Sequence, residues 1–133
     1  MNNLTPAELV LMRKACQITR DALNYAETLI KPGISTKALD NLVEKFIINS
    51  GAIPACKGYE GYPATICASV NDTVVHGIPS EKVILKEGDI ISVDIVVEYK
   101  GLYGDAARTF PVGKISPEKA KLIEVTKRCF FEG

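Results

Sequence analysis

Several residue types that common active sites require are scarce in this sequence. Of its 133 residues none is tryptophan, and only His76 is histidine. A single histidine excludes a zinc site built from several imidazoles, and any catalytic triad would have to use His76. Long apolar runs are missing too, because Asp94 interrupts the most hydrophobic stretch before it reaches the roughly 18 residues that a membrane-spanning helix needs.

An excess of charge of one sign is also absent. The 16 Lys and Arg balance the 16 Asp and Glu, so nothing in the charge favours nucleic acid or an anionic membrane as a partner. Residues 1–6 have neither the basic nor the apolar region of a signal peptide. No CxxC pair occurs among Cys16, Cys56, Cys67 and Cys129. We therefore expect reduced thiols and a cytoplasmic protein that binds neither membrane nor nucleic acid directly.

The composition that remains is ordinary for a globular protein, and it predicts one domain over residues 1–133. Thr5 and Glu8 form a capping-box pattern that predicts a helix to about residue 30. A second helix is predicted from Ser35 to Gly51, and a third begins at Ser116. The second helix carries one apolar stripe, made of Leu39, Leu42, Val43, Phe46 and Ile47.

The β-like segments lie between the second and third helices. Short pieces are predicted at residues 65–70 and 73–75, with a turn between them. The strongest strands, residues 90–99 and 102–112, are joined by Lys100-Gly101, which predicts a two-residue hairpin turn. The order of helices and strands favours the α+β class, with two N-terminal helices, antiparallel hairpins and a C-terminal helix.

The hairpin turn fixes which residues face each other. Val96 should lie opposite Asp105 and Asp94 opposite Ala107, so the two aspartates share a face as diagonal neighbours about 7–8 Å apart. The alternate residues of the first strand point to the other face, into a core. They are Ile91, Val93, Ile95 and Val97.

Two interpretations of the aspartate face remain open. Two neighbouring carboxylates repel, and a divalent cation between Asp94 and Asp105 would offset that cost, because carboxylate oxygens are ligands for hard and borderline metals. The alternative is a face that is simply in contact with water, as is usual for an antiparallel sheet. A β-bulge would also shift the register and separate the pair.

Several segments, in order along the chain, resemble the methionine aminopeptidases of type I, the bacterial form. The similarity covers nearly the whole sequence. It is carried by Cys56-Lys57-Gly58-Tyr59-Glu60-Gly61-Tyr62-Pro63, residues 67–71, Val75-His76-Gly77-Ile78-Pro79, residues 88–94, residues 101–105, and the helical segments around residues 31–36 and 39–40. The resemblance implies the pita-bread fold of the creatinase and aminopeptidase group, with this chain as its N-terminal half.

That resemblance also implies an activity. Members are metallohydrolases that remove the initiator methionine from nascent polypeptides near the ribosome, using two divalent metal ions of the cobalt, manganese, iron or zinc type. Asp94 and Asp105 match the two aspartates that bind these metals, with Asp94 bidentate and Asp105 bridging. His76 matches the histidine that contacts the substrate near the scissile peptide bond, although a histidine before Gly-Ile-Pro is also an ordinary loop residue.

A methionine pocket is implied by four further positions, Cys56, Tyr59, Tyr62 and Cys67, which would form a soft apolar wall for a thioether. The alternatives are a surface loop for the tyrosines and core packing for the cysteines. Two positions depart from the family pattern. Glu60 stands where histidine is common, which removes a proton donor from the pocket mouth, and Val75 stands where cysteine often precedes the histidine.

Other ligands of the family, a histidine and two glutamates, match nothing in this sequence. We therefore expect weak metal binding and no hydrolysis by the 133-residue chain alone. Alternatives to an aminopeptidase half are a non-catalytic methionine- or peptide-binding module and a prolidase-like relative; the motifs at residues 59–63 and 75–79 argue against the latter. Phe130 and Phe131 either pack on this domain's own core or stay exposed, and an exposed half-sheet favours self-association.

Overall fold

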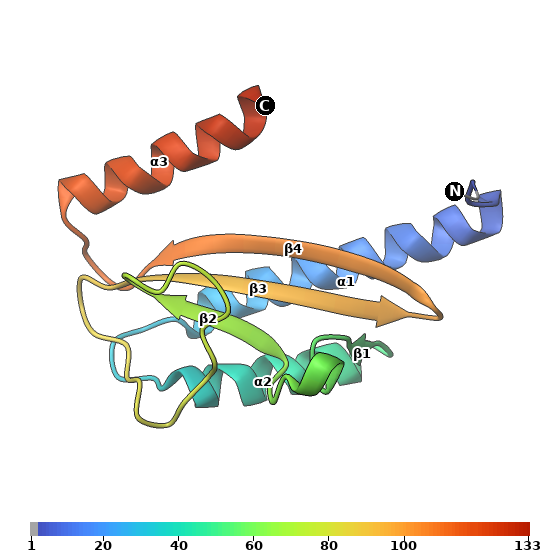
Figure 1. Cartoon of the computed structure of the whole chain (residues 1–133), viewed down its shortest axis with the longest axis horizontal. Helices are drawn as coiled ribbons and strands as arrows, with labels where there is room; N and C mark the ends of the chain where they lie inside the picture. Colours follow the sequence, from blue (N-terminus) through green and yellow to red (C-terminus); the bar gives the residue numbers. More distant parts are fainter. Residues whose placement is uncertain (1–2) are drawn as a thin grey trace.

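An antiparallel sheet with two helices on one face forms the body of the molecule (Figure 1). The computed structural model describes residues 3–133. Met1 and Asn2 lie outside the described residues; they begin the segment, residues 1–6, that we predicted not to be a signal peptide. The elements are α1 (Pro6–Leu29), α2 (Thr36–Asn49), β1 (Ile53–Pro54), the 3-10 turn η1 (Tyr59–Gly61), β2 (Ile66–Val70), β3 (Ile90–Tyr99), β4 (Leu102–Pro111) and α3 (Pro117–Glu132). The α+β prediction is confirmed.

Helix starts lie where the sequence predicts them. The Glu8 amide donates to Thr5 Oγ1 at 3.2 Å, and the Thr5 amide donates to Glu8 Oε2 at 2.7 Å, which completes a capping box. At α2 the Ala38 amide donates to Ser35 Oγ at 3.0 Å. These local bonds satisfy amides that the first helical turn leaves without partners, so the caps could be recognised from sequence alone.

The β3–β4 hairpin has the predicted turn and register. Lys100 and Gly101 both have positive φ angles, 49° and 84°, as a tight turn of the type I′ class requires. Pairing runs without a bulge from Tyr99 opposite Leu102 to Ile90 opposite Pro111. The sheet therefore keeps a strict alternation of faces along both strands.

β3 is the central strand of the sheet. β4 pairs with one edge of it, while β2 and the short β1 pair with the other edge at different heights. The strand predicted at residues 73–75 is wrong: these residues form no strand, and Val74 and Val75 are 81% and 63% exposed. Their β propensity has no effect because no apolar surface lies against them, and propensity in strands depends on such packing.

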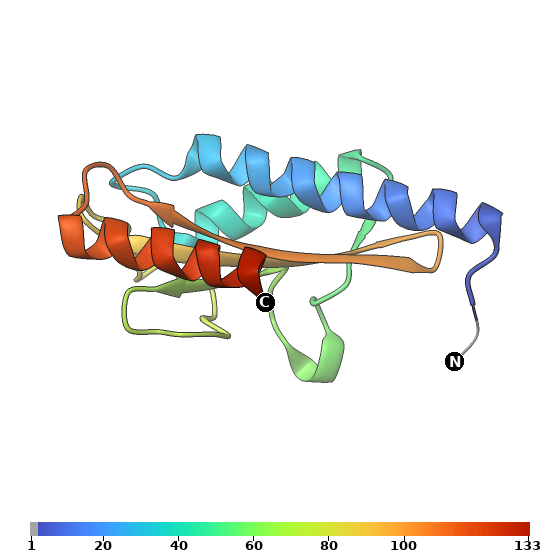
Figure 2. The same ribbon diagram turned by 90° about the horizontal axis from the view of Figure 1, so that it is seen from above.

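The core lies between the sheet and the pair α1 and α2. Ile91, Val93, Ile95 and Val97 are all fully buried there. In Figure 2 both helices lie on one side of the sheet and η1 lies on the other. The second face of the sheet thus has no helix over it, and it is the face that carries Asp94.

α3 extends from the end of β4 and buries none of its residues (Figure 1). Phe130 and Phe131 are 79% and 73% exposed, and their rings meet edge to face with centroids 5.2 Å apart. Packing of this helix end on the domain's own core, one of the two alternatives, is therefore wrong. None of the described helices is long and apolar enough to cross a membrane.

Candidate functional site

The open face of the sheet brings the two aspartates together. Cys67 of β2 lies opposite Asp94 of β3, and Asp94 lies opposite Ala107 of β4. Asp105 faces Val96, the next residue of β3 on the same face. The diagonal arrangement of Asp94 and Asp105 that the hairpin predicts is thus present, and Cys67 is added to the same row.

The two carboxylates influence each other electrostatically. Burial raises the pKa of Asp94, and the neighbouring Asp105 raises it further. The imidazole of His76 acts in the opposite direction and lowers the pKa of Asp94, so His76 also lies near this carboxylate. A cation bound between the carboxylates would relieve the repulsion that raises this pKa.

Two free thiols line the same region. Cys67 is 8% exposed and Cys56 is half-buried, and neither forms a disulfide. Burial raises the pKa of the Cys56 thiol, and Cys67, Asp94 and Asp105 contribute in the same direction. Both observations place Cys56 beside the aspartate pair as a neutral, polarisable group.

The two candidate tyrosines have different surroundings. The Tyr62 hydroxyl donates to the carbonyl of Ile66 at 2.8 Å and also lies 3.3 Å from the carbonyl of Gly77. Burial and the neighbouring Cys67 raise the pKa of Tyr62. Tyr59 is 69% exposed in η1, and its side chain has no hydrogen bond to the described residues. Of the predicted pocket tyrosines, the structure brings only Tyr62 into the cluster.

His76 lies in the loop between β2 and β3 with a left-handed backbone, at φ 55°. Such a conformation is uncommon for residues other than glycine and needs support from its surroundings. A pocket of about 330 Å³ lies beside the histidine. Its lining includes Ala68, Val70, Thr73, His76, Ile78 and Val83.

Asp40 has a structural role that the motifs did not indicate. Its side chain is 1% exposed, and its Oδ1 accepts bonds from the amides of Thr65 at 2.9 Å and Ile66 at 2.8 Å. Lys37 lies 3.5 Å from Oδ2. One signal was present in the sequence: Asp40 precedes Val43 by three positions, which puts a carboxylate on the buried stripe of α2.

Glu60, the departure from the family pattern, has a φ of 47° within η1. Gly58 and Gly61 on either side also have positive φ angles, 85° and 79°. The Glu60 side chain is exposed. It therefore adds a solvated negative charge to the loop that carries Tyr59 and Tyr62.

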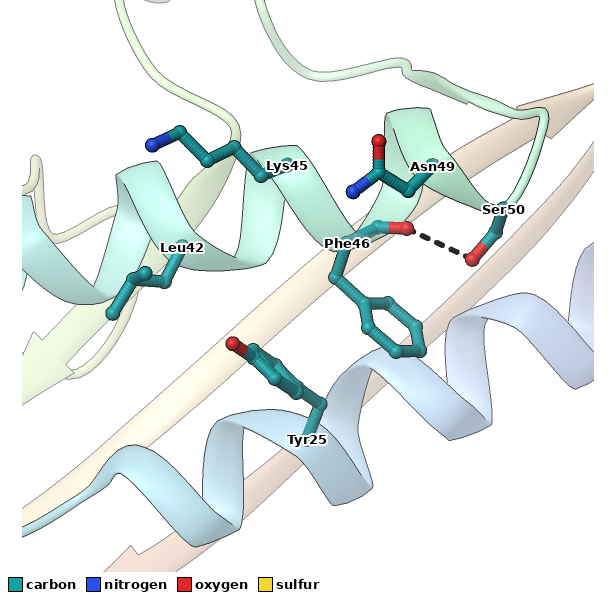
Figure 3. A pocket seen from close by; sticks show the side chains of 6 residues that line it. All are labelled: Tyr25, Leu42, Lys45, Phe46, Asn49 and Ser50. Atoms are coloured by element: carbon teal, nitrogen blue, oxygen red, sulfur yellow. Dashed lines mark hydrogen bonds between the residues drawn. The ribbon is translucent and has the colours of Figure 1, made fainter.

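A larger hollow, of about 530 Å³, lies between α1 and α2 (Figure 3). The rings of Tyr25 and Phe46 stack there with centroids 5.0 Å apart, and the Ser50 hydroxyl donates to the carbonyl of Phe46 at 2.8 Å. Lys45 is the charged residue of its lining. This hollow is on the helical side of the sheet, away from the carboxylates, and its lining includes no His, Cys, Asp or Glu.

The aspartate pair supplies part of the ligand set that a divalent metal ion needs. Asp94 and Asp105 supply adjacent carboxylate oxygens, which suit divalent metals. Within residues 3–133, however, no group of three or more His, Cys, Asp and Glu side chains is arranged to hold a metal. The pair therefore fits one side of a metal centre, with the remaining coordination positions left to water or to other protein groups.

Comparison with known proteins points to one family. The model of "Metallopeptidase family M24" matches residues 10–133. A methionine aminopeptidase of Clostridium acetobutylicum is 54% identical over 126 residues, which are 95% of this chain and 50% of that protein. Methionine aminopeptidase 1 of Bacillus subtilis is 50% identical over 129 residues, covering 97% of this chain and 52% of that protein.

Solved structures agree with the sequence matches. The methionine aminopeptidase of Thermotoga maritima superimposes with a TM-score of 0.93 at 40% identity, over 96% of this chain and 51% of that one. The prolidase of Pyrococcus furiosus gives a TM-score of 0.76 at 22% identity, over 91% of this chain and 34% of that one, and so shares the fold alone. The expected half of a pita-bread fold is confirmed, and the chain spans about half the length of the curated relatives it matches.

Proposed function

The chain belongs to metallopeptidase family M24, and from this membership we propose that it works in a methionine aminopeptidase, a hydrolase that removes the N-terminal methionine of nascent proteins. The observation that carries the proposal is the Asp94–Asp105 pair on the open face of the sheet. Residues 1–133 form one domain in this proposal and supply one side of the active site. The greater identity to methionine aminopeptidases than to prolidase favours this activity over a prolidase-like one.

Asp94 and Asp105 would hold divalent metal, of the cobalt, manganese, iron or zinc type, together with ligands from further protein. When bound, such metal lowers the pKa of a coordinated water and polarises a peptide carbonyl. Both carboxylates project from paired strands, so they would hold the metal in a fixed position. Because the strands are already ordered, the two side chains would lose little conformational freedom when the metal binds.

The substrate methionine would contact Cys56, Cys67 and Tyr62, with Tyr59 at the rim. Thiols and an aromatic ring suit a polarisable thioether. His76 would donate a hydrogen bond to the peptide group or to its developing oxyanion. Substrates of this kind are nascent polypeptide N-termini, so we place the protein in the cytoplasm and close to the ribosome.

A second candidate is a methionine-binding module without catalysis. It is favoured because, within residues 3–133, no group of three or more His, Cys, Asp and Glu side chains is arranged to hold a metal ion. Adding the C-terminal half of the Clostridium acetobutylicum relative to this chain separates the two candidates. Release of methionine from a Met-Ala-Ser peptide supports the enzyme, whereas peptide binding without release supports the module.

Metal binding is the first prediction. In a calorimetric titration with Mn²⁺ we expect weak binding by the parent chain and affinity at least about tenfold lower for Asp94→Asn, since one of two carboxylate ligands becomes an amide. Asp21→Asn is the matched control, because Asp21 is an exposed carboxylate on α1, which lies on the opposite side of the sheet from Asp94 (Figure 2). Its affinity should equal that of the parent.

Loss of folding would not explain such a result. Because the pKa of Asp94 is raised in the folded chain, ionising this carboxyl is less favourable there than in the unfolded chain. Its ionisation therefore lowers the free energy of unfolding as pH rises through this pKa. A neutral Asn removes that cost, and the thermal midpoint of Asp94→Asn at neutral pH should not fall below the parent's. Unchanged Mn²⁺ affinity in Asp94→Asn would show that the carboxylate pair is not the metal site.

Self-association is the second prediction. β4 leaves its outer edge unpaired by any described residue, and α3 presents Phe130 and Phe131 to solvent. We expect light scattering to show an average mass that rises above the 14.4 kDa of one chain as concentration increases. Replacing both phenylalanines by serine should keep the mass near one chain, while Val74→Ser, at an exposed apolar residue elsewhere, should not. A constant mass for the parent at all concentrations would contradict self-association.

A further inference from the structure

The Tyr62 hydroxyl joins two segments that lie far apart in sequence. It is 2.8 Å from the carbonyl oxygen of Ile66, at the start of β2, and 3.3 Å from that of Gly77, in the loop that follows β2. Both oxygens are acceptors, so the single hydroxyl proton is shared between them. A tyrosine that served only as an apolar wall would not need this pair of contacts.

Gly77 is held against β2 more closely than any other residue type allows. A Cβ atom at this position would lie 2.3 Å from the carbonyl oxygen of Ala68. The Gly77 carbonyl accepts from the Ala68 amide at 2.8 Å, and the Gly77 amide donates to Ser69 Oγ at 3.1 Å. Among the described residues, the Tyr62 hydroxyl thus supplies the one hydrogen bond to Gly77 that comes from outside β2.

The residue beside this anchored peptide is His76. Its φ of 55° lies in the left-handed region, where a side chain other than glycine persists only when neighbouring contacts hold it. Its own side chain is exposed. Burial of the imidazole therefore gives the His76 backbone little support, whereas the next residue, Gly77, is held by hydrogen bonds to β2 and to Tyr62.

We propose that the Tyr62 hydroxyl is a positioning group for His76: it clamps the Gly77 carbonyl beside β2 and so keeps the imidazole on the carboxylate face. The clamp rests on the proposed function, since the position of His76 matters for catalysis only if His76 contacts the substrate. Tyr62 then has two separate roles. In the proposed function its ring would contact the substrate methionine, and its hydroxyl holds the loop.

Replacing Tyr62 by phenylalanine tests the clamp, because it removes the hydroxyl and keeps the ring. His76 is the only histidine, so its ring proton signals are unambiguous in an NMR spectrum. We expect the His76 signals of Tyr62→Phe to move toward those of an unstructured histidine. The amide of Ala68, which bonds Gly77, should exchange with solvent at least about tenfold faster, since local opening becomes easier.

Tyr59→Phe is the matched control, since Tyr59 lies three residues away, is 69% exposed, and its hydroxyl donates no hydrogen bond to the described residues. It should leave the His76 signals and Ala68 exchange unchanged, and the amides of Val93 and Ile95 should exchange as in the parent in both variants. Parent-like His76 signals and Ala68 exchange in Tyr62→Phe would overturn the proposal. So would equal changes in the two variants.

A second measurement covers the case in which Tyr62→Phe does not fold. In the parent, a slowly exchanging Tyr62 hydroxyl proton with a nuclear Overhauser effect to the Gly77 α-protons supports the clamp. Well-resolved Tyr62 ring signals without that hydroxyl proton and its Overhauser effect overturn the clamp. Titration with methionine amide separates the two proposals. If the parent chain and both variants fail to bind methionine amide, the result counts against the methionine pocket. The clamp is judged separately, on the His76 signals and the exchange of the Ala68 amide.

Discussion

Asp40→Ala should lower the free energy of unfolding by about 2–4 kcal/mol. The substitution leaves the amides of Thr65 and Ile66 buried without an acceptor, and each orphaned donor costs about 1–3 kcal/mol. Thr65 is itself fully buried, so water has little access to replace the lost acceptor. The effect should be seen as a lower midpoint in urea, with little change in slope.

The neighbouring lysine provides the control for this change. Lys37→Ala removes the ion pair at 3.5 Å but leaves both bonds to Oδ1 intact, so it should cost less than Asp40→Ala, which removes the ion pair and both bonds. Asp40→Asn keeps one acceptor oxygen and should fall between the two. If Asp40→Ala unfolds at the same urea concentration as Lys37→Ala, the two backbone bonds do not contribute as described.

Gly104→Ala should separate α1 from the sheet and cost about 1–3 kcal/mol or more, as overpacking of a close contact does. A Cβ atom on Gly104 would lie 2.5 Å from Thr19 Oγ1 and 2.7 Å from the carbonyl oxygen of Ala15. The Thr19 hydroxyl cannot move away freely, because it donates to that same carbonyl at 2.8 Å. The backbone of α1 must therefore shift, and the core beneath it loosens.

Ala107→Val is a suitable comparison for Gly104→Ala. Ala107 belongs to the same strand but is exposed on the open face, where no helix covers it. Its enlargement should change the free energy of unfolding by less than about 0.5 kcal/mol, as is usual for surface positions. A thermal melt of Gly104→Ala that matches the melt of Ala107→Val would show that α1 tolerates the extra methyl group.

Local rules account for the parts of the fold that the sequence predicts well. Lys100-Gly101 sets the turn, and side-chain alternation along β3 then fixes the register of the whole hairpin. Thr5 and Ser35 cap the first turns of their helices through bonds to residues only three positions away. None of these features depends on a distant segment, so each could be derived without knowledge of the tertiary structure.

Distant contacts explain the parts that could not be derived. Asp40 bonds amides 25 and 26 positions away, and Tyr62 reaches Gly77 across 15 positions. No periodicity or turn pattern encodes such bonds. For the same reason the sequence did not distinguish the buried hydroxyl of Tyr62 from the exposed Tyr59, and it assigned a strand to residues 73–75 that have no surface to pack on.

In the candidate site, too, local rules predict one part and fail to predict the other. The proximity of Asp94 to Asp105 followed from the hairpin register, whereas Cys56, Tyr62 and His76 entered only through the family resemblance. Their placement depends on the path of the chain between β1 and β3, where turns with positive φ angles at Asn71 and His76 redirect it. Interactions between segments, rather than local preference, determine that path.

The central position of β3, with strands on both of its edges, has a consequence for how the site would respond to a ligand. Asp94 lies on the segment that has least freedom to adapt, since its neighbours Val93 and Ile95 are fully buried. His76 lies on an exposed loop attached at a few points. When a peptide binds, we therefore expect β3 and Asp94 to keep their positions. Any conformational change would occur in the loop that carries His76.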